Sequence, residues 1–141
     1  MEYRIVIPQY LHEPGLGLAR EVGEVIYWPE DSPMPRDQLL AAAESADGFL
    51  THPASRYDRE LLNRAPRLRV ISNIAVGYDN VDVAACTERG IAVCNTPSVL
   101  TDATADLTLA LMLAVCRRVA EADTSRQVIE LRWARVSRRH G

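Results

Sequence analysis

The stretch Leu68-Arg-Val-Ile-Ser-Asn-Ile-Ala75, followed by Val76-Gly-Tyr-Asp-Asn-Val-Asp82 and then by Ile91-Ala-Val-Cys94, decides the fold. Its first part is rich in β-branched residues and predicts a strand that stops just before a glycine turn. A helix over Val81–Arg89 is expected next, closed by Gly90, because helix C-termini favour glycine. The last part predicts a second strand, so the stretch as a whole is typical of a parallel β-α-β unit.

The same alternation of strands and helices extends toward the N-terminus. Further strands are predicted at Tyr3–Pro8, Glu24–Trp28 and Asp47–Thr51, and further helices at Leu16–Val22, Arg36–Ala46 and Asp58–Arg64. Five strands that alternate with helices over short connections predict an α/β fold. The natural topology at this size is a flavodoxin-like five-stranded parallel sheet with helices on both faces.

A long C-terminal apolar helix is expected in addition, over Thr101–Asp123. Within Leu107–Cys116 every residue except Thr108 is apolar, and a helix that is apolar all round must be buried all round. At 1.5 Å per residue this helix would measure about 34 Å, longer than short strands can cover. We therefore expect a homodimer through this helix, with or without a domain swap.

Composition excludes several classes of protein. The 141 residues are 48% hydrophobic and 25% charged, which is typical of a globular domain. All 16 basic residues are arginines, so neither a P-loop NTPase nor a lysine Schiff base is possible. No apolar run reaches the roughly 18 residues of a membrane span, and no signal peptide is visible, so we expect a cytoplasmic protein without membrane contact.

Metal, disulfide and nucleic-acid sites are not expected either. The cysteines Cys86, Cys94 and Cys116 and the three histidines lack the spacing of a zinc site, and an odd number of cysteines favours reduced thiols. Residues 126–141 carry five arginines against one glutamate, but such a basic end is more often a solvated helix end than a nucleic-acid contact.

The turn after the fourth predicted strand is the best candidate site. Ligands of open parallel sheets bind beyond the carboxyl ends of the strands, where main-chain N–H groups are free. Val76, Gly77 and Tyr78 could hold a carboxylate or phosphate there, with Thr51 at the tip of another strand, although an ordinary capped turn stays open as the alternative. Pro14–Arg20 contains G-x-G, but it begins too far from its strand for a dinucleotide site. No residue pattern identifies a catalytic nucleophile or base.

Several motifs in order resemble the D-isomer-specific 2-hydroxyacid dehydrogenases, with glyoxylate/hydroxypyruvate reductase as the nearest branch. They are Val76–Asp82, Arg89–Pro97, Leu100–Asp106 and Arg117-Arg118. The resemblance implies a substrate-binding domain at 1–100, an interdomain helix and extension at 101–133, and a tail at 134–141. It also implies that Val76 and Gly77 bind the carboxylate of a small 2-oxo or 2-hydroxy acid, and that Thr104 lies beside bound NAD(P).

The resemblance also implies what this chain lacks. After Trp133 the family continues into a nucleotide-binding domain that carries the catalytic Arg, Glu or Asp, and His, whereas this sequence stops at Gly141. We therefore expect a truncated dehydrogenase that binds no cofactor by itself and is inactive alone. The alternatives are a subunit of a split dehydrogenase and a small-anion-binding regulatory module.

Overall fold

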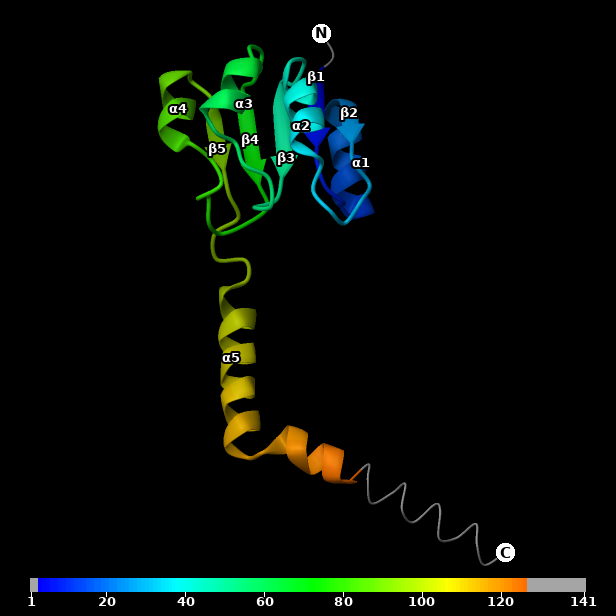
Figure 1. Ribbon diagram of the computed structural model, residues 1–141, viewed down its shortest axis with the longest axis vertical. Helices are drawn as coiled ribbons and strands as arrows, with labels where there is room; N and C mark the ends of the chain where they lie inside the picture. The colour runs from blue at the N-terminus through cyan, green and yellow to red at the C-terminus, as the bar shows by residue number, and fades with distance from the viewer. Residues whose placement is uncertain (1–2, 127–141) are drawn as a thin grey trace, which may run out of the picture. The chain divides into compact units, whose positions relative to one another are not determined.

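The computed structural model of the chain describes residues 3–126 and shows five strands that alternate with helices (Figure 1). In chain order the elements are β1 (Tyr3–Ile7), α1 (Glu13–Val22), β2 (Gly23–Tyr27), α2 (Arg36–Ala43), β3 (Gly48–Thr51), α3 (Arg59–Arg64), β4 (Val70–Asn73), α4 (Val83–Glu88), β5 (Ala92–Cys94) and α5 (Thr101–Cys116). The predicted alternation is therefore confirmed, with element ends that differ by a few residues.

The five strands form one parallel sheet in the order β2-β1-β3-β4-β5. This is the strand order of flavodoxin-like sheets, in which the chain starts near the middle and winds outward in both directions. The register pairs Thr51 at the end of β3 with Asn73 at the end of β4. The α/β part of the predicted fold is thus confirmed, and the carboxyl ends of neighbouring strands lie at one edge.

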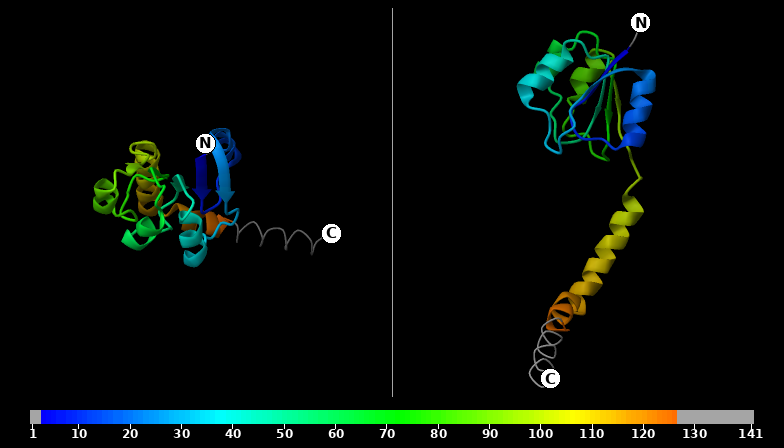
Figure 2. Two further views of the ribbon diagram at one scale, coloured as in Figure 1. Left: turned by 90° about the horizontal axis from the view of Figure 1, so that it is seen from above. Right: turned by 90° about the vertical axis from the view of Figure 1, so that its right-hand side faces the viewer.

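Each face of the sheet carries its own apolar cluster. Helices α2, α3 and α4 pack on one face, where Leu39, Leu61 and Cys86 meet Phe49 and Ile71 of the sheet. Helix α1 lies on the opposite face (Figure 2, right), where Leu16 and Ala19 pack against Ile7. Both faces of a parallel sheet are normally covered in this way, so strands such as β1 contain consecutive apolar residues rather than a strict alternation of apolar and polar ones.

The chain divides into two compact units between Pro97 and Ser98. The sheet and helices α1 to α4 make up the first unit, and α5 lies in the second. Residues 119–126 of the second unit are again helical. The end of the predicted extension and the tail 134–141 lie outside the described residues.

The expectation of one long apolar helix over Thr101–Asp123 is wrong. Helix α5 ends at Cys116, and the turn at Arg117-Arg118 separates it from the helical residues 119–126. Arg118 adopts a left-handed φ of 52°, a conformation that commonly terminates helices. The sixteen residues of α5 span only about 24 Å. In the single chain none of the residues of α5 is buried, so the expected cover by a partner stays a prediction.

Candidate functional site

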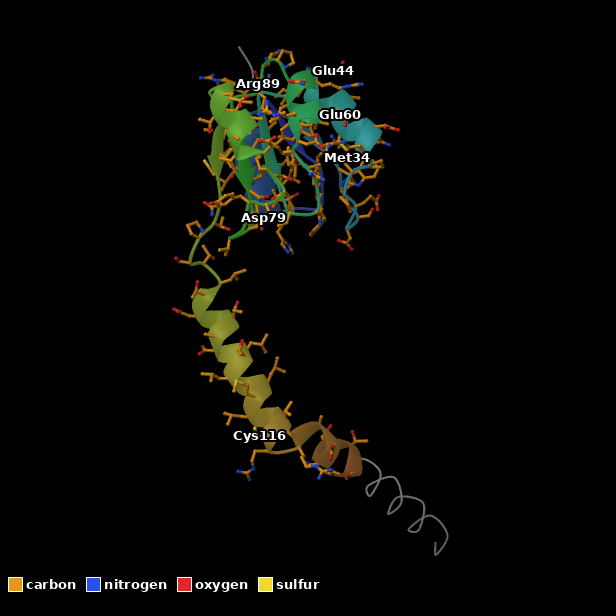
Figure 3. All side chains as sticks on the ribbon, turned by 60° about the vertical axis from the view of Figure 1, so that its left-hand side comes forward. Met34, Glu44, Glu60, Asp79, Arg89 and Cys116 are labelled. Carbon is orange, nitrogen blue, oxygen red and sulfur yellow. The ribbon has the colours of Figure 1, made fainter. Side chains whose placement is uncertain are left out.

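The carboxyl ends of β1, β3, β4 and β5 meet at one edge of the sheet, because these strands are parallel neighbours in this order. The turn that contains Asp79 follows β4 at this edge. Figure 3 shows Asp79 at one end of the first unit and Arg89 and Glu44 at the other. Ligands of open parallel sheets bind beyond the carboxyl ends, so the edge near Asp79 is where a site is expected.

The first half of this turn is held by the segment that follows β5. The carbonyl oxygen of Ala75 accepts a hydrogen bond from the N–H of Thr96 at 2.9 Å. The carbonyl oxygen of Val76 accepts one from Nδ2 of Asn95 at 2.8 Å. Both carbonyl groups are therefore directed toward the protein.

The second half of the turn is held from β4 and from within the turn. Nδ2 of Asn73 donates to the carbonyl oxygen of Gly77 at 2.8 Å. The N–H of Val81 donates to the carbonyl oxygen of Tyr78 at 2.9 Å. Four consecutive carbonyl groups, from Ala75 to Tyr78, are thus bonded inside the first unit.

The N–H groups of the same four peptides are left without a partner in the described part of the chain. No hydrogen-bond acceptor for the N–H groups of Val76, Gly77, Tyr78 and Asp79 is found within residues 3–126. All peptides in the described chain are trans, so each N–H points away from its own inward-facing carbonyl. Successive main-chain N–H groups that face outward form anion-binding concavities in proteins. The turn is therefore equipped to bind a carboxylate or phosphate.

A side-chain network fixes the base of the turn. Asn73 also donates through Nδ2 to Oδ1 of Asn80 at 3.1 Å, and Asn80 donates through Nδ2 to Oδ1 of Asn73 at 3.4 Å. Asn80 Nδ2 further donates to the carbonyl oxygen of Ser55 at 3.1 Å, in the loop after β3. Sequence analysis did not single out Asn73 or Asn95. Asparagine within a strand is uncommon, which was an available signal for Asn73, whereas Asn95 follows its strand and gave no such signal.

Gly77 is not required by the backbone of the turn. Its φ lies outside the left-handed region, and an added Cβ would meet only Oδ2 of Asp79, at 3.6 Å, which is an ordinary contact. The flanking side chains of Val76 and Tyr78 are 50% and 52% exposed. The absence of a side chain at position 77 therefore leaves open space beside the free N–H groups, as an approaching ligand would need.

Thr51 lies at the predicted strand tip, but its side chain is buried. Its hydroxyl accepts a hydrogen bond from the hydroxyl of Tyr57 at 2.7 Å and donates to the carbonyl oxygen of His52 at 3.2 Å. The ring of Tyr57 packs edge-on against Phe49 with centroids 5.0 Å apart, and burial raises the pKa of Tyr57. In this structure Thr51 supports the core beneath the edge, and its role as a substrate-binding residue stays a prediction.

Two buried polar atoms near this edge have no hydrogen-bond partner among the described residues. They are Nε2 of His52, after β3, and Oε1 of Gln9, after the neighbouring β1. Burial lowers the pKa of His52 below its ordinary value, which favours the neutral imidazole. The amide of Gln9 is held through its Nε2, which donates to the carbonyl oxygen of Asp31 at 3.3 Å.

The remaining candidates are the G-x-G stretch and Thr104, whose place beside a cofactor stays a prediction. Gly15 and Gly17 of the G-x-G stretch lie within α1 rather than in a turn at a strand tip, so they cannot wrap a pyrophosphate. Thr104 lies in the first turn of α5, in the second unit, and its carbonyl accepts from the hydroxyl of Thr108 at 2.8 Å. Within residues 3–126 no group of three His, Cys, Asp or Glu side chains could hold a metal ion. The same part of the chain contains no helix with the length and apolarity to cross a membrane.

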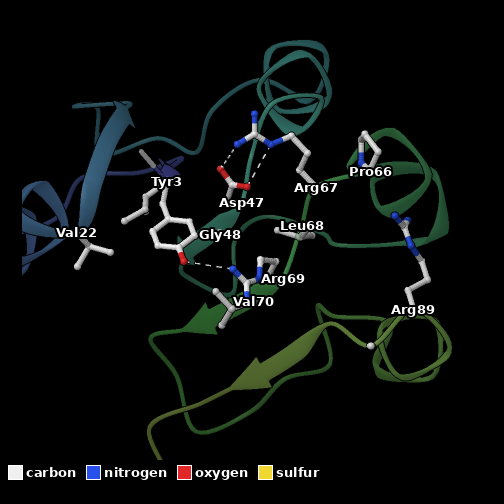
Figure 4. Close-up of a pocket in the computed structure, with 12 residues that line it drawn as sticks. Tyr3, Val22, Asp47, Gly48, Pro66, Arg67, Leu68, Arg69, Val70 and Arg89 are labelled. Carbon is white, nitrogen blue, oxygen red and sulfur yellow. Dashed lines mark hydrogen bonds and ion pairs between the residues drawn. The ribbon is translucent and has the colours of Figure 1, made fainter. Parts of the chain in front are cut away.

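A cavity of about 650 Å³ opens at the opposite, amino edge of the sheet (Figure 4). Its cationic groups are already engaged. Arg67 pairs with Asp47 at 2.7 Å, and Arg89 donates to main-chain carbonyl groups at the end of α3. Arg69 lies over the ring of Tyr3, 5.7 Å from its centroid. These contacts tie neighbouring elements together, so the turn after β4 is the better candidate for ligand binding.

Comparison with known proteins matches most of the chain to one family. Residues 5–134 match the family model described as "D-isomer specific 2-hydroxyacid dehydrogenase, catalytic domain". A glyoxylate reductase of Thermococcus gammatolerans is 47% identical over 124 residues, which cover 88% of this chain and 37% of that protein. A glyoxylate reductase of Aeropyrum pernix is 44% identical over 120 residues, covering 85% and 36%. The chain thus spans little more than a third of the length of these relatives.

Solved structures show the same fold. A protein of Thermus thermophilus is similar with a TM-score of 0.72 and 40% identity, over 86% of this chain and 39% of that one. A putative D-isomer specific 2-hydroxyacid dehydrogenase of a Polaromonas species gives a TM-score of 0.78 at 27% identity, over 87% and 39%.

Proposed function

Because this chain belongs to the D-isomer specific 2-hydroxyacid dehydrogenases, through their catalytic domain, we propose that its first unit binds the carboxylate of a small 2-oxo or 2-hydroxy acid. The similar glyoxylate reductases make glyoxylate the first substrate to test, and a similar glyoxylate/hydroxypyruvate reductase of solved structure adds hydroxypyruvate. The binding residues are Val76, Gly77 and Tyr78, through their main-chain N–H groups.

One observation carries this proposal: the turn has its carbonyl groups bonded inward and its N–H groups unpaired within residues 3–126. A carboxylate has two oxygens that accept hydrogen bonds and a negative charge that strengthens each of them. Main-chain donors cannot be deprotonated at neutral pH, so this recognition does not depend on a titrating side chain in the turn. Binding there would fix the orientation of the acid, and the 2-oxo carbon would extend away from the turn.

The chain's own residues supply binding and orientation, not hydride transfer. The family uses NAD(P), and a solved NADPH-dependent glyoxylate/hydroxypyruvate reductase of Sinorhizobium meliloti was crystallised with NADP. The G-x-G stretch does not form the turn that a dinucleotide needs, because Gly15 and Gly17 lie inside a helix. We therefore propose that the 141-residue chain alone does not reduce glyoxylate at an enzymatic rate.

Titration of the isotopically labelled chain with glyoxylate, followed by amide NMR, tests the binding proposal. We expect the amide signals of Val76, Gly77 and Tyr78 to shift in the millimolar range. Gly77→Ala should weaken binding because its methyl group enters the open space beside the donors. Gly17→Ala is the matched control, because its Cβ would have no neighbour within 4 Å. Unchanged turn amides throughout the titration would reject the site.

Activity measurements separate the proposal from its alternatives. Oxidation of NAD(P)H by the pure chain at an enzymatic rate would show that it is complete as an enzyme. Restoration of activity by a second chain would identify a subunit of a split dehydrogenase. Anion binding without turnover in either case would favour a regulatory module.

We also propose that α5 pairs with the same helix of a second copy. Its apolar residues Leu107, Leu109, Leu111 and Leu113 are each more than half exposed. If five such side chains left 40–60 Å² each in water, roughly 5–8 kcal/mol of burial would be unused. A two-fold pairing is the simplest closed arrangement that covers such a surface.

A further inference from the structure

Two asparagine side chains hold the peptides of the proposed carboxylate site in one orientation. Nδ2 of Asn95 donates to the carbonyl oxygen of Val76, and Nδ2 of Asn73 donates to that of Gly77, each at 2.8 Å. We propose that Asn73 and Asn95 are positioning residues of the anion site. They would act by directing the N–H groups of Gly77 and Tyr78 outward, and this inference rests on the proposed function.

The peptide orientation matters because a peptide can present either end to a ligand. If the peptide between Val76 and Gly77 rotated by half a turn, its carbonyl oxygen would face the anion in place of its N–H. The flanking side chains cannot prevent this, since Val76 and Tyr78 are half exposed. The two asparagine amides can, because they bond the carbonyl groups from the protein side.

The amide of Asn73 is itself fixed in one of its two possible orientations. Its Oδ1 accepts from Nδ2 of Asn80, and Nδ2 of Asn80 also donates to the carbonyl oxygen of Ser55. A carbonyl oxygen only accepts, so Asn80 must present its nitrogen to Ser55 and Asn73 must present its nitrogen to Gly77. The loop after β3 thereby determines which group of the turn after β4 faces outward.

Asn95 reaches the turn from a different strand. It follows β5, is half-buried, and makes its side-chain bond to a peptide 19 residues earlier in the sequence. The side-chain amides of Asn73 and Asn95 therefore come from the ends of two neighbouring strands, and each binds a different peptide of the turn. Because Asn95 lies outside the packed core, we expect its replacement to have little effect on folding.

The experiment is the glyoxylate titration of the full chain, followed by amide NMR and paired with thermal unfolding. Asn95→Leu removes the donor at similar size, Asn95→Asp replaces the donor with an acceptor, and Asn95→Gln keeps an amide donor. Asn63→Asp is the matched control for added charge, because Asn63 is exposed on α3. If Asn95→Leu does not fold, Asn95→Ser, which is too short to reach Val76, replaces it.

We expect Asn95→Leu and Asn95→Asp to weaken glyoxylate binding by about tenfold or more, the equivalent of one charge-assisted hydrogen bond of roughly 1.4 kcal/mol. Their unfolding temperatures should stay near that of the wild type, Asn95→Gln should recover part of the affinity, and Asn63→Asp should bind like the wild type. A wild type that binds no glyoxylate would refute the proposed function. A wild type that binds, together with an Asn95→Leu variant of equal affinity, would refute the positioning role alone.

Discussion

Removing the hydroxyl of Tyr57 should destabilise the first unit, because this group donates to the hydroxyl of Thr51 at 2.7 Å with both side chains fully buried. Tyr57→Phe loses one net hydrogen bond and leaves an oxygen of Thr51 without its donor, which should cost about 1–2 kcal/mol of unfolding free energy. Thr51→Val strands the phenolic O–H in the core and should cost about 1–3 kcal/mol. In a domain of this size, each kcal/mol lowers the melting temperature by about 4–8 °C.

The double variant Tyr57→Phe/Thr51→Val measures the coupling between the two hydroxyl groups. With both polar groups replaced by apolar ones of similar shape, neither the phenolic O–H nor the oxygen of Thr51 is left without the other, so the combined cost should fall below the sum of the two single costs by about 1–2 kcal/mol. Urea denaturation of the wild type, the two single variants and the double variant measures this coupling. Costs that add within about 0.5 kcal/mol would refute the hydrogen bond's contribution.

The same variants decide between two roles for Thr51. If its hydroxyl belongs to the core, Thr51→Val loses stability and keeps its affinity for glyoxylate once the folded fraction is taken into account. If Thr51 contacts the acid, as sequence analysis predicts, the variant loses affinity instead. The amide titration of the turn distinguishes these results, because it reports binding only from folded molecules.

Three other predictions concern charge, thiols and assembly. Burial alone would raise the pKa of Asp58, but hydrogen bonds from Arg36 and from the N-terminus of α3 lower it overall. The ionised Asp58 therefore stabilises the folded state above about pH 4, and this stabilisation is lost as the pH falls further. Arg36→Met should lower the unfolding free energy by about 1 kcal/mol at neutral pH. Urea denaturation at several pH values should also show that the variant loses less unfolding free energy than the wild type below about pH 4, and an equal loss would contradict the prediction. Cys94 is exposed while burial raises the pKa of Cys86, so a disulfide reagent should label Cys94 in the native protein and Cys86 only after unfolding. Light scattering should give a molar mass of about twice the 15.7 kDa of one chain. Leu111→Glu should reduce this mass or precipitate the protein, and a wild-type monomer would overturn the proposed pairing of α5.

The sheet and the turn were predictable because their signals are local. Strands of a parallel sheet are rich in β-branched residues, as Ile5, Val6 and Ile7 of β1 illustrate, and a glycine followed by Asp and Asn marks the turn. The hydrogen bond from Asn95 to Val76 was not predictable in this way. The two residues are 19 positions apart, and their contact depends on β5 lying beside β4. Tertiary pairing of this kind leaves no periodicity in a sequence.

The end of α5 shows a different limit of sequence analysis. Arginine is a good helix former, so Arg117-Arg118 gave no reason to expect a break. The helix nevertheless stops there, with Arg118 in a left-handed conformation that its residue type does not favour. The apolar composition of Leu107–Cys116 indicated a surface in need of cover, but not the length of the helix that carries it.

A recognition surface made of backbone amides is nearly invisible to alanine scanning. Replacing Val76 or Tyr78 by alanine removes a half-exposed side chain and leaves every N–H donor of the turn in place. These two positions can therefore drift in evolution, or be redesigned to contact the rest of a bound acid, without loss of the anion contacts. Amide-to-ester replacement, which exchanges a single N–H for oxygen, would expose the contribution of each donor.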